Sequence, residues 1–521
     1  MAYNFPAIIH RVDSNLIALE ACKLMGLENV RPGFALEAFT KDCDNSDEVD
    51  VEKINFQGGM GNNYERLEFL GDCFLKMATT ISLFTLDPGR SEYDYHVDRM
   101  VLTCNQSLYN IATEVKLEEY VRSTEFSRRT WYPEGLILKR GKRTEAKRKH
   151  ELAAKVIADV CEALIGAAYM TTRHQGSFDM AVSAVTSVVK DPKHSMTKWS
   201  EYYATYKKPE WQTRQPTPIQ MDMADKFHQR MGYKFNHPQL LRCAFYHPSY
   251  PTSSENLPSY QRLEFLGDAL LDMVCVDYLF RRFPGADPQW LTEHKMAMTG
   301  NHFLGFLSFY LEFHRSILTN SAQVLGDHTE YVSEIEMALR AAKGETIDAG
   351  DEESNFKRNF WVNCKRPPKG LADVLEAYVG AIFVDSEYDY GTVQAFFDRH
   401  IQPWFEDMRL YDTYANRSTV TQLTTLMQTK FGCTDWRLPV RSSGIIADGE
   451  GDAIGLAGGR KKMEQVVCGL WLHGKMAAHA VSESDRYARL AAARRAVVLL
   501  EELDVAEFKA KYGCDCVMES E

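Results

Sequence analysis

Long apolar runs are missing from the 521-residue sequence, in which no stretch of eighteen apolar residues occurs. A helix that crosses a bilayer needs about twenty such residues, so we expect no membrane-spanning segment and no membrane partner. The N-terminus lacks a basic segment followed by a long apolar core, so we expect no secretory signal peptide. A regular cysteine framework is missing too, because the twelve cysteines are irregularly spaced. That spacing favours a reducing compartment, either cytoplasmic or nuclear.

An excess of positive charge is also missing, since 60 Lys and Arg face 72 Asp and Glu, for a net charge of −12. Taken alone, this balance argues against a nucleic-acid partner. However, a local basic patch can still bind phosphates, and clustered carboxylates can hold cations. The sequence also has no G-x-x-x-x-G-K-[ST] phosphate loop, so we expect no ATP site of that kind.

An internal repeat organises the chain. The heptapeptide RLEFLGD occurs at 66–72 and again at 262–268, and the related segments ADVCEALIGA and ADVLEAYVGA follow at 158–167 and 372–381. Two matches in the same order indicate two copies of one domain. The second copy is longer by an acidic stretch at 344–355, which we interpret as a surface insertion.

Both copies have the apolar periodicity of helices and lack runs of alternating residues, so we expect two all-α domains. After residue 418, a helical pattern, segments that alternate like strands and a second helical pattern predict a small α-β-β-β-α domain. The fold class is therefore mainly α. The predicted parts are a lead-in at 1–17, a first domain at 18–173, a linker at 174–223, a second domain at 224–388, a linker at 389–417, the small domain at 418–508 and a tail at 509–521.

Acidic residues recur at helical spacing in both copies. Glu68 and Asp72 are four residues apart and share a helix face, as do Asp159 and Glu162, three apart on a second helix. Small residues on the second helix allow another helix to approach closely. The second copy supplies the same pattern with Glu264, Asp268, Asp373 and Glu376.

Such clusters are unfavourable unless a cation neutralises them, and Mg²⁺ or Mn²⁺ prefers oxygen ligands. A single Asp-x-x-Glu is usually a solvated helix surface, but repetition within apolar segments favours a site. Lys155 and Lys369 each precede their helix aspartate by four residues and could neutralise charge or contact a phosphate. We predict metal ligands at Glu68, Asp159, Glu162, Glu264, Asp373 and Glu376.

The motif pair resembles the signature of the ribonuclease III family, and two copies followed by an α-β-β-β-α domain resemble the C-terminal part of fungal Dicer-like proteins. The resemblance implies an internal pseudo-dimer, and so a monomer, in which each domain cuts one strand of double-stranded RNA. All eight carboxylates match the family's residue types, as do Lys155 and Lys369. It further implies small RNAs for silencing or antiviral defence, and silencing-complex proteins as partners.

A complete Dicer also carries a helicase and an end-binding domain upstream, whereas Met1 here stands just before the first repeat. The sequence is equally consistent with a full-length chain and with a fragment. A competing hypothesis is a catalytically weak protein that binds double-stranded RNA and keeps the fold. A third is a helical scaffold with surface acids, which would bind neither metal nor RNA.

Basic residues gather in three places where phosphate contacts are expected. They are the segment 139–149, the loop residues Arg460, Lys461 and Lys462, and the helix residues Arg486, Arg489, Arg494 and Arg495. In each case a solvated surface is the simpler interpretation.

Cysteines and a histidine near the C-terminus form a possible zinc set of Cys433, His473, Cys514 and Cys516. Their long spacing alone favours a core cysteine and a disordered tail. The pattern is similar to a zinc site of fungal Dicers, and that resemblance implies structural Zn²⁺. His479 and Cys468 are the competing ligands.

Overall fold

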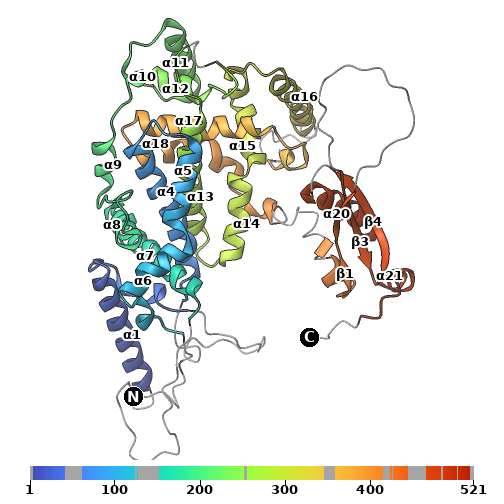
Figure 1. The fold of residues 1–521 in the computed structure, drawn as a ribbon, viewed down its shortest axis with the longest axis horizontal. Helices are drawn as coiled ribbons and strands as arrows, with labels where there is room; N and C mark the ends of the chain where they lie inside the picture. Colours follow the sequence, from blue (N-terminus) through green and yellow to red (C-terminus); the bar gives the residue numbers. More distant parts are fainter. Residues whose placement is uncertain are drawn as a thin grey trace, which may run out of the picture. The chain divides into compact units, whose positions relative to one another are not determined.

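A computed structural model describes residues 4–41, 62–123, 126, 152–251, 255–344, 358–412, 414, 423–424, 426–443, 465–482, 485–501 and 503–516. The chain divides into two compact units, Met1–Met408 and Arg409–Glu521. Figure 1 shows the first as helical and the second as a small sheet with helices. The acidic insertion at 344–355 lies outside the described residues except for Gly344.

The first unit holds both sequence repeats as helices in the same order. The first repeat comprises α1 (Phe5–Leu24), α2 (Pro32–Ala38), α4 (Glu65–Leu86), α5 (Glu92–Thr103), α6 (Asn105–Glu114), α7 (Ala154–Thr172) and α8 (Asp179–Val189). The second comprises α11 (Pro218–Met231), α12 (Pro238–Ala244), α13 (Gln261–Arg282), α14 (Pro288–Thr299), α15 (Asn301–Tyr310), α16 (Ala322–Gly344), α17 (Lys369–Asp385) and α18 (Tyr390–Phe396).

Two small details show that the repeats share one fold. In the first, an isolated parallel bridge joins Thr40 to Arg122, and in the second an equivalent bridge joins Tyr246 to Leu318. Each bridge ties the segment after a short helix, α2 or α12, to the segment after α6 or α15. The predicted pair of all-α domains is therefore confirmed.

Within each repeat, the two motif helices cross almost backbone to backbone because glycines lie at the crossing. A Cβ atom on Gly71 of α4 would lie 1.8 Å from the carbonyl oxygen of Glu162, and one on Gly166 of α7 would lie 2.3 Å from that of Leu67. The corresponding Cβ distances in the second repeat are 1.8 Å at Gly267 and 2.3 Å at Gly380. Only glycine permits such an approach.

Helices α4 and α13 also pack against each other, and this contact pairs the two repeats inside one chain. Arg66 of α4 donates to the carbonyl oxygens of Phe280 and Phe283 at 3.3 Å, and Arg262 of α13 donates to that of Pro88. Helix α4 is apolar and long enough to cross a membrane, but 78% of its apolar window is buried inside the protein. Among the described residues, this is the single helix that meets that length and hydropathy, and its burial is that of a core helix.

The segments expected to be linkers contain packed helices. Helices α9 (Trp199–Thr205) and α10 (Glu210–Thr213) lie between the repeats, after α8. Tyr202 is buried, and the Trp199 indole donates to the carbonyl oxygen of Tyr388 at 3.0 Å. Aromatic residues of the segment expected to be a linker therefore contribute to the core. Helix α1 likewise runs through the boundary expected at residue 17.

The second unit contains η11 (Leu426–Lys430), β1 (Trp436–Arg437), β2 (Val440–Ser443), β3 (Gln465–Leu472), β4 (Lys475–Ser482), α20 (Asp485–Glu501) and α21 (Val505–Tyr512). Strand β3 pairs antiparallel with β4 on one side and with β1 and β2 on the other. Strands β1 and β2 keep one register along β3, so they form a single strand interrupted at Leu438 and Pro439. Proline has no N–H to donate, which accounts for the break. The predicted α-β-β-β-α pattern is thus present.

One helix was missed by the sequence analysis. Helix α21 extends into the segment expected to be a tail, and the tail begins only after Tyr512. Asp504 and Glu507 form a capping box at its start, in which each side chain accepts from the other residue's backbone N–H. The D-x-x-E signal was visible in the sequence.

Candidate nuclease sites and zinc site

The glycine crossing of α4 and α7 brings three predicted metal ligands of the first repeat together. One carboxylate oxygen from each of Glu68, Asp159 and Glu162 lies within 4.8 Å of the others. The Lys155 ammonium lies 2.8 Å from the nearer oxygen of Asp159 and 3.7 Å from Glu68. Residues from two distant stretches of sequence therefore converge as the spacing predicted.

The second repeat builds the same arrangement where α13 crosses α17. Oxygens of Glu264, Asp373 and Glu376 again lie within 4.8 Å of one another. The Lys369 ammonium lies 2.7 Å from both Glu264 and Asp373. The Tyr260 hydroxyl donates to Asp373 at 3.2 Å, a contact that the sequence analysis did not identify.

We call the three clustered carboxylates of each repeat a trio: Glu68, Asp159 and Glu162 in the first repeat, and Glu264, Asp373 and Glu376 in the second. The fourth predicted carboxylate of each repeat lies beside its trio. Of the neighbouring charges, Asp72 raises the pKa of Glu162 most strongly, and Asp268 does the same for Glu376. Neither belongs to the group of oxygens within 4.8 Å. Asp268 is instead 2.8 Å from the ammonium of Lys76, which comes from the other repeat.

Burial and mutual repulsion make it unfavourable for all three carboxyl groups of a trio to be ionised at once. Burial, followed by the neighbouring carboxylates, raises the pKa of Glu162 to about 9. The same causes raise the pKa of Glu68 and of Glu264 to about 7, and that of Glu376 well above its ordinary value. A hard divalent cation offsets this cost, and an all-oxygen donor set fits Mg²⁺ or Mn²⁺.

These raised pKa values make the free energy of unfolding depend on pH, and they fix the direction of that dependence. Between about pH 4.5 and 9, the metal-free folded protein holds protons that the unfolded chain has released, so its unfolding free energy falls as pH rises. We expect the E162Q variant to flatten this fall, because glutamine does not titrate. Denaturant midpoints measured across this pH range provide the check, with E119Q, at an exposed glutamate, as control. Equal slopes for all three proteins would contradict the expectation.

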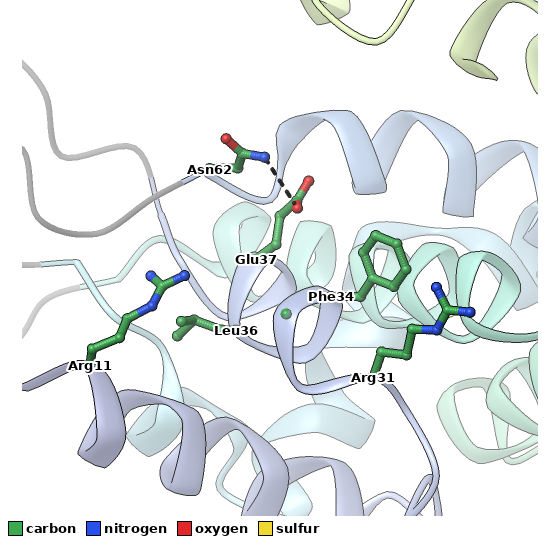
Figure 2. A pocket seen from close by; sticks show the side chains of 7 residues that line it. Arg11, Arg31, Phe34, Leu36, Glu37 and Asn62 are labelled. Atoms are coloured by element: carbon green, nitrogen blue, oxygen red, sulfur yellow. Dashed lines mark hydrogen bonds between the residues drawn. The ribbon is translucent and has the colours of Figure 1, made fainter. Parts of the chain in front are cut away.

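A separate hollow of about 430 Å³ lies on the first repeat and contains none of the eight carboxylates. Figure 2 shows Arg11 of α1 and Arg31 beside it, with the Asn62 amide directed at Glu37. Burial raises the pKa of Glu37. No sequence pattern pointed to this hollow, and it plays no part in the geometry of the carboxylate sites.

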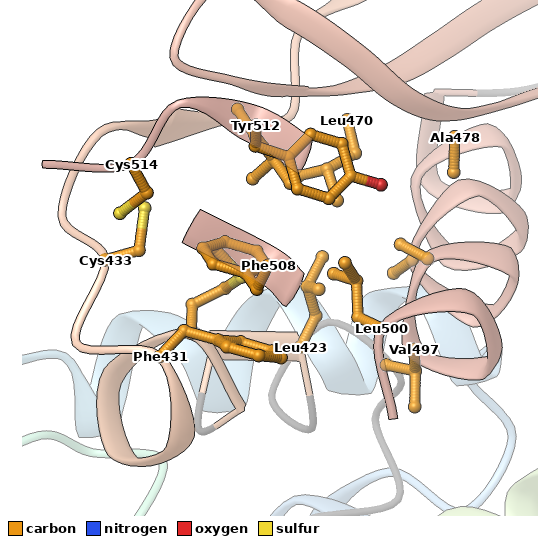
Figure 3. Packing of buried hydrophobic residues seen from close by; sticks show 14 residues of the cluster. Leu423, Phe431, Cys433, Leu470, Ala478, Val497, Leu500, Phe508, Tyr512 and Cys514 are labelled. Atoms are coloured by element: carbon orange, nitrogen blue, oxygen red, sulfur yellow. The ribbon is translucent and has the colours of Figure 1, made fainter. Parts of the chain in front are cut away.

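The predicted zinc ligands also come together. Ligand atoms of Cys433, His473, Cys514 and Cys516 all lie within 4.8 Å of one another. Figure 3 shows the sulfurs of Cys433 and Cys514 directed at each other at the edge of the apolar core. Nε2 of His473 lies 3.4 Å from the Cys433 sulfur and 3.6 Å from the Cys516 sulfur. Three thiolates with one imidazole are a donor set that suits tetrahedral Zn²⁺.

The surroundings of His473 favour ligation through Nε2. His473 and Gly474 form the turn between β3 and β4, and both have positive φ angles, 46° and 76°. Nδ1 of His473 lies 3.5 Å from a carboxylate oxygen of Asp435. In many zinc sites a carboxylate in this position accepts from the histidine ring and fixes its tautomer. Asp435 was missed in the sequence, where no spacing rule links it to His473.

The competing ligands lie elsewhere. Cys468 is buried in a second apolar cluster between the sheet and α20, where its thiol approaches the carbonyl oxygen of Leu438. His479 is exposed on β4, opposite Gly469 of β3. Neither belongs to the Cys433 group.

Most residues of the predicted basic patches lie outside the described residues. These are 139–149, residues 460–462 and the side chains of Arg486 and Arg494. Arg489 and Arg495 of α20 are exposed, and Arg495 donates to the carbonyl oxygen of His479 at 2.8 Å. Their contact with RNA stays a prediction.

Comparison with known proteins assigns both units. The ribonuclease III domain model matches residues 65–173 and 261–387, and a model for a dsRNA binding domain matches residues 411–502. Dicer-like protein 1 of Chaetomium globosum is 58% identical over 100% of this chain and 33% of its own length. Dicer-like protein 1 of Neurospora crassa is 58% identical over 98% of this chain and 33% of its own length.

The chain thus spans about a third of the length of the relatives it matches. Among solved structures, the nuclease domain of ribonuclease III from Campylobacter jejuni is 25% identical, with a TM-score of 0.24, over 35% of this chain and 97% of that one. So low a TM-score adds nothing to the sequence matches. On those matches, the chain carries two ribonuclease III domains and a double-stranded RNA-binding domain, and it is similar over its whole length to fungal Dicer-like protein 1.

Proposed function

We propose that this chain is a metal-dependent endoribonuclease that cuts double-stranded RNA, with one strand cut by each ribonuclease III domain. The observation that carries the proposal is the presence of two carboxylate trios, one at each of two equivalent helix crossings. The direct packing of α4 against α13 supports their action as one internal pair.

The chemistry follows from the donor set. When bound to a trio, Mg²⁺ or Mn²⁺ supplies an activated water and stabilises the leaving oxygen of a phosphodiester. The carboxylates orient the reacting groups, while Lys155 and Lys369 hold positive charge at the two trios. The side chains of Lys155 and Lys369 are about two-thirds exposed, at 65% and 66%, and can therefore meet a phosphate.

The test is a cleavage assay on a long RNA duplex with a different label on each strand. The protein is expected to cut both strands when Mg²⁺ or Mn²⁺ is added and neither in metal-free buffer. The double variant E162Q/E376Q is expected to bind the duplex without cutting it. Metal-independent cutting, or none by the unaltered protein, would overturn the proposal; binding without cutting would favour the catalytically weak RNA-binding alternative.

We further propose that the products are small RNAs used in silencing, including antiviral defence, and that silencing-complex proteins receive them. The proposal is supported by the similarity to Dicer-like proteins. Sizing the products of the same assay tests it, because a single discrete length is expected. We place this activity inside the cell, in the cytoplasm or nucleus, since the cysteines within the described ranges form no disulfide.

The C-terminal unit is proposed to hold structural Zn²⁺ through Cys433, His473, Cys514 and Cys516. We expect C514S/C516S to lose the ion and to lower the melting temperature of this unit, because zinc joins the tail to the β3–β4 turn. Native mass spectrometry gives the metal content. C104S, which alters a thiol on the first repeat, is the matched control. Unchanged zinc content in C514S/C516S would contradict the assignment.

A further inference from the structure

Helix α4 contributes to both nuclease sites, although its carboxylates belong to the first. Lys76 follows Asp72 by one helical turn and reaches across to the second repeat. Its ammonium lies 2.8 Å from Asp268 and 2.6 Å from Asp272, both on α13. A side chain of the first repeat thus contacts the fourth carboxylate of the second site.

The lysine is firmly anchored. Asp272 has a side chain that is 8% exposed and is also 3.0 Å from the ammonium of Lys295 on α14. Lys76 is itself only 26% exposed. A buried ion pair of this kind restricts the lysine to one position, and that position fixes the carboxylate of Asp268 beside Glu376.

The two sites differ in this respect. The repeat offset places Asp272 at the position equivalent to Lys76, so no equivalent lysine points from α13 toward Asp72. Among the described residues, no cation lies within ion-pair distance of Asp72; burial raises its pKa, and Lys295 and Lys76 oppose that rise without forming an ion pair with it. Only the second site therefore has its fourth carboxylate held by the opposite repeat.

We propose that Lys76 is a positioning residue for the second nuclease site, supplied from the first repeat. The inference rests on the proposed nuclease function and adds to it a coupling between the sites. Removing Lys76 would free Asp268 to move away from Glu376 and leave Asp272 with Lys295 as its remaining partner. The first trio does not contact Lys76 and would stay intact.

The experiment uses the whole chain and the duplex with differently labelled strands. D72N and D268N first identify which strand belongs to which site. K76M is then expected to slow cutting of the D268N-sensitive strand by roughly 10–100-fold. The other rate should change far less, because Lys76 acts on Asp72 without pairing with it. K76R should restore most of the lost rate, because arginine keeps the charge. K226M, at an exposed lysine on α11, is the matched control.

Strand selectivity separates this role from a purely structural one. Equal slowing of both strands, or no slowing of either, would overturn the inference. If K76M fails to fold, K76M/D272N removes both charges of the pair and must show the same selectivity. Failure of the unaltered protein to cut either strand would instead count against the proposed nuclease function itself.

Discussion

Replacing Glu162 by glutamine is expected to convert double-strand cutting into nicking. Glutamine keeps the size of the side chain but removes the negative charge that one metal ligand supplies to the first trio. A loss of several kcal/mol of transition-state stabilisation slows that cut by roughly a thousandfold. The second trio, on α13 and α17, shares no residue with the first, so its strand should still be cut.

The reciprocal variant E376Q should nick the opposite strand. Denaturing gels of a duplex labelled on both strands measure each rate separately. E114Q, an exposed glutamate at the end of α6, serves as a matched control that should cut both strands normally. Loss of both cuts from either single variant would show that the sites are not assigned one to a strand.

Replacing Gly71 by alanine is expected to be among the most damaging single-methyl additions in the chain. The new Cβ would meet the carbonyl oxygen of Glu162 at 1.8 Å, and backbone cannot move aside as a flexible side chain can. Overpacking costs about 1–3 kcal/mol and sometimes more. Separating α4 from α7 would also pull Glu68 away from Asp159, so we expect the first cut to be lost.

Gly33 provides the control, because a Cβ there would meet nothing within 4 Å. G33A should keep both the stability and the activity of the unaltered protein, or gain slightly in helix stability. Chemical denaturation and the strand-specific assay measure both quantities. A G71A variant with unchanged stability would mean that the helices do not cross as closely as described.

The nuclease carboxylates were predictable because regular geometry connects them. Spacings of three and four residues place Glu68 with Asp72, and Asp159 with Glu162, whatever the rest of the fold does. Because the same pattern recurs in the second copy, these acids could be distinguished from ordinary surface residues. The zinc ligands were harder to identify, since 40 and 41 residues separate His473 from Cys433 and Cys514, and only the folded sheet shows that Cys468 points elsewhere.

Features that depend on differences between the repeats were not predictable in the same way. A comparison of the copies emphasises shared residues, whereas Lys76 matters because its counterpart is Asp272. Gly71 was overlooked because small residues were noted only on the second motif helix, at 158–167, and not on the helix that crosses it. The helices of the supposed linkers depend on aromatic side chains such as Trp199, whose ring packs against Phe383 and Tyr390 of the second repeat.

The break at Pro439 has a consequence for behaviour at high concentration. Among the described strands, the β1–β2 strand lies at one edge of the sheet, where free N–H and C=O groups invite a strand from another molecule. Pro439 breaks the regular backbone at the centre of that strand, where its carbonyl oxygen faces β3 and accepts from Gly469. The exposed Arg437 and Arg441 place like charges on either side of the break. Stacking of one sheet edge on another is thereby disfavoured, which protects the protein against β-sheet aggregation.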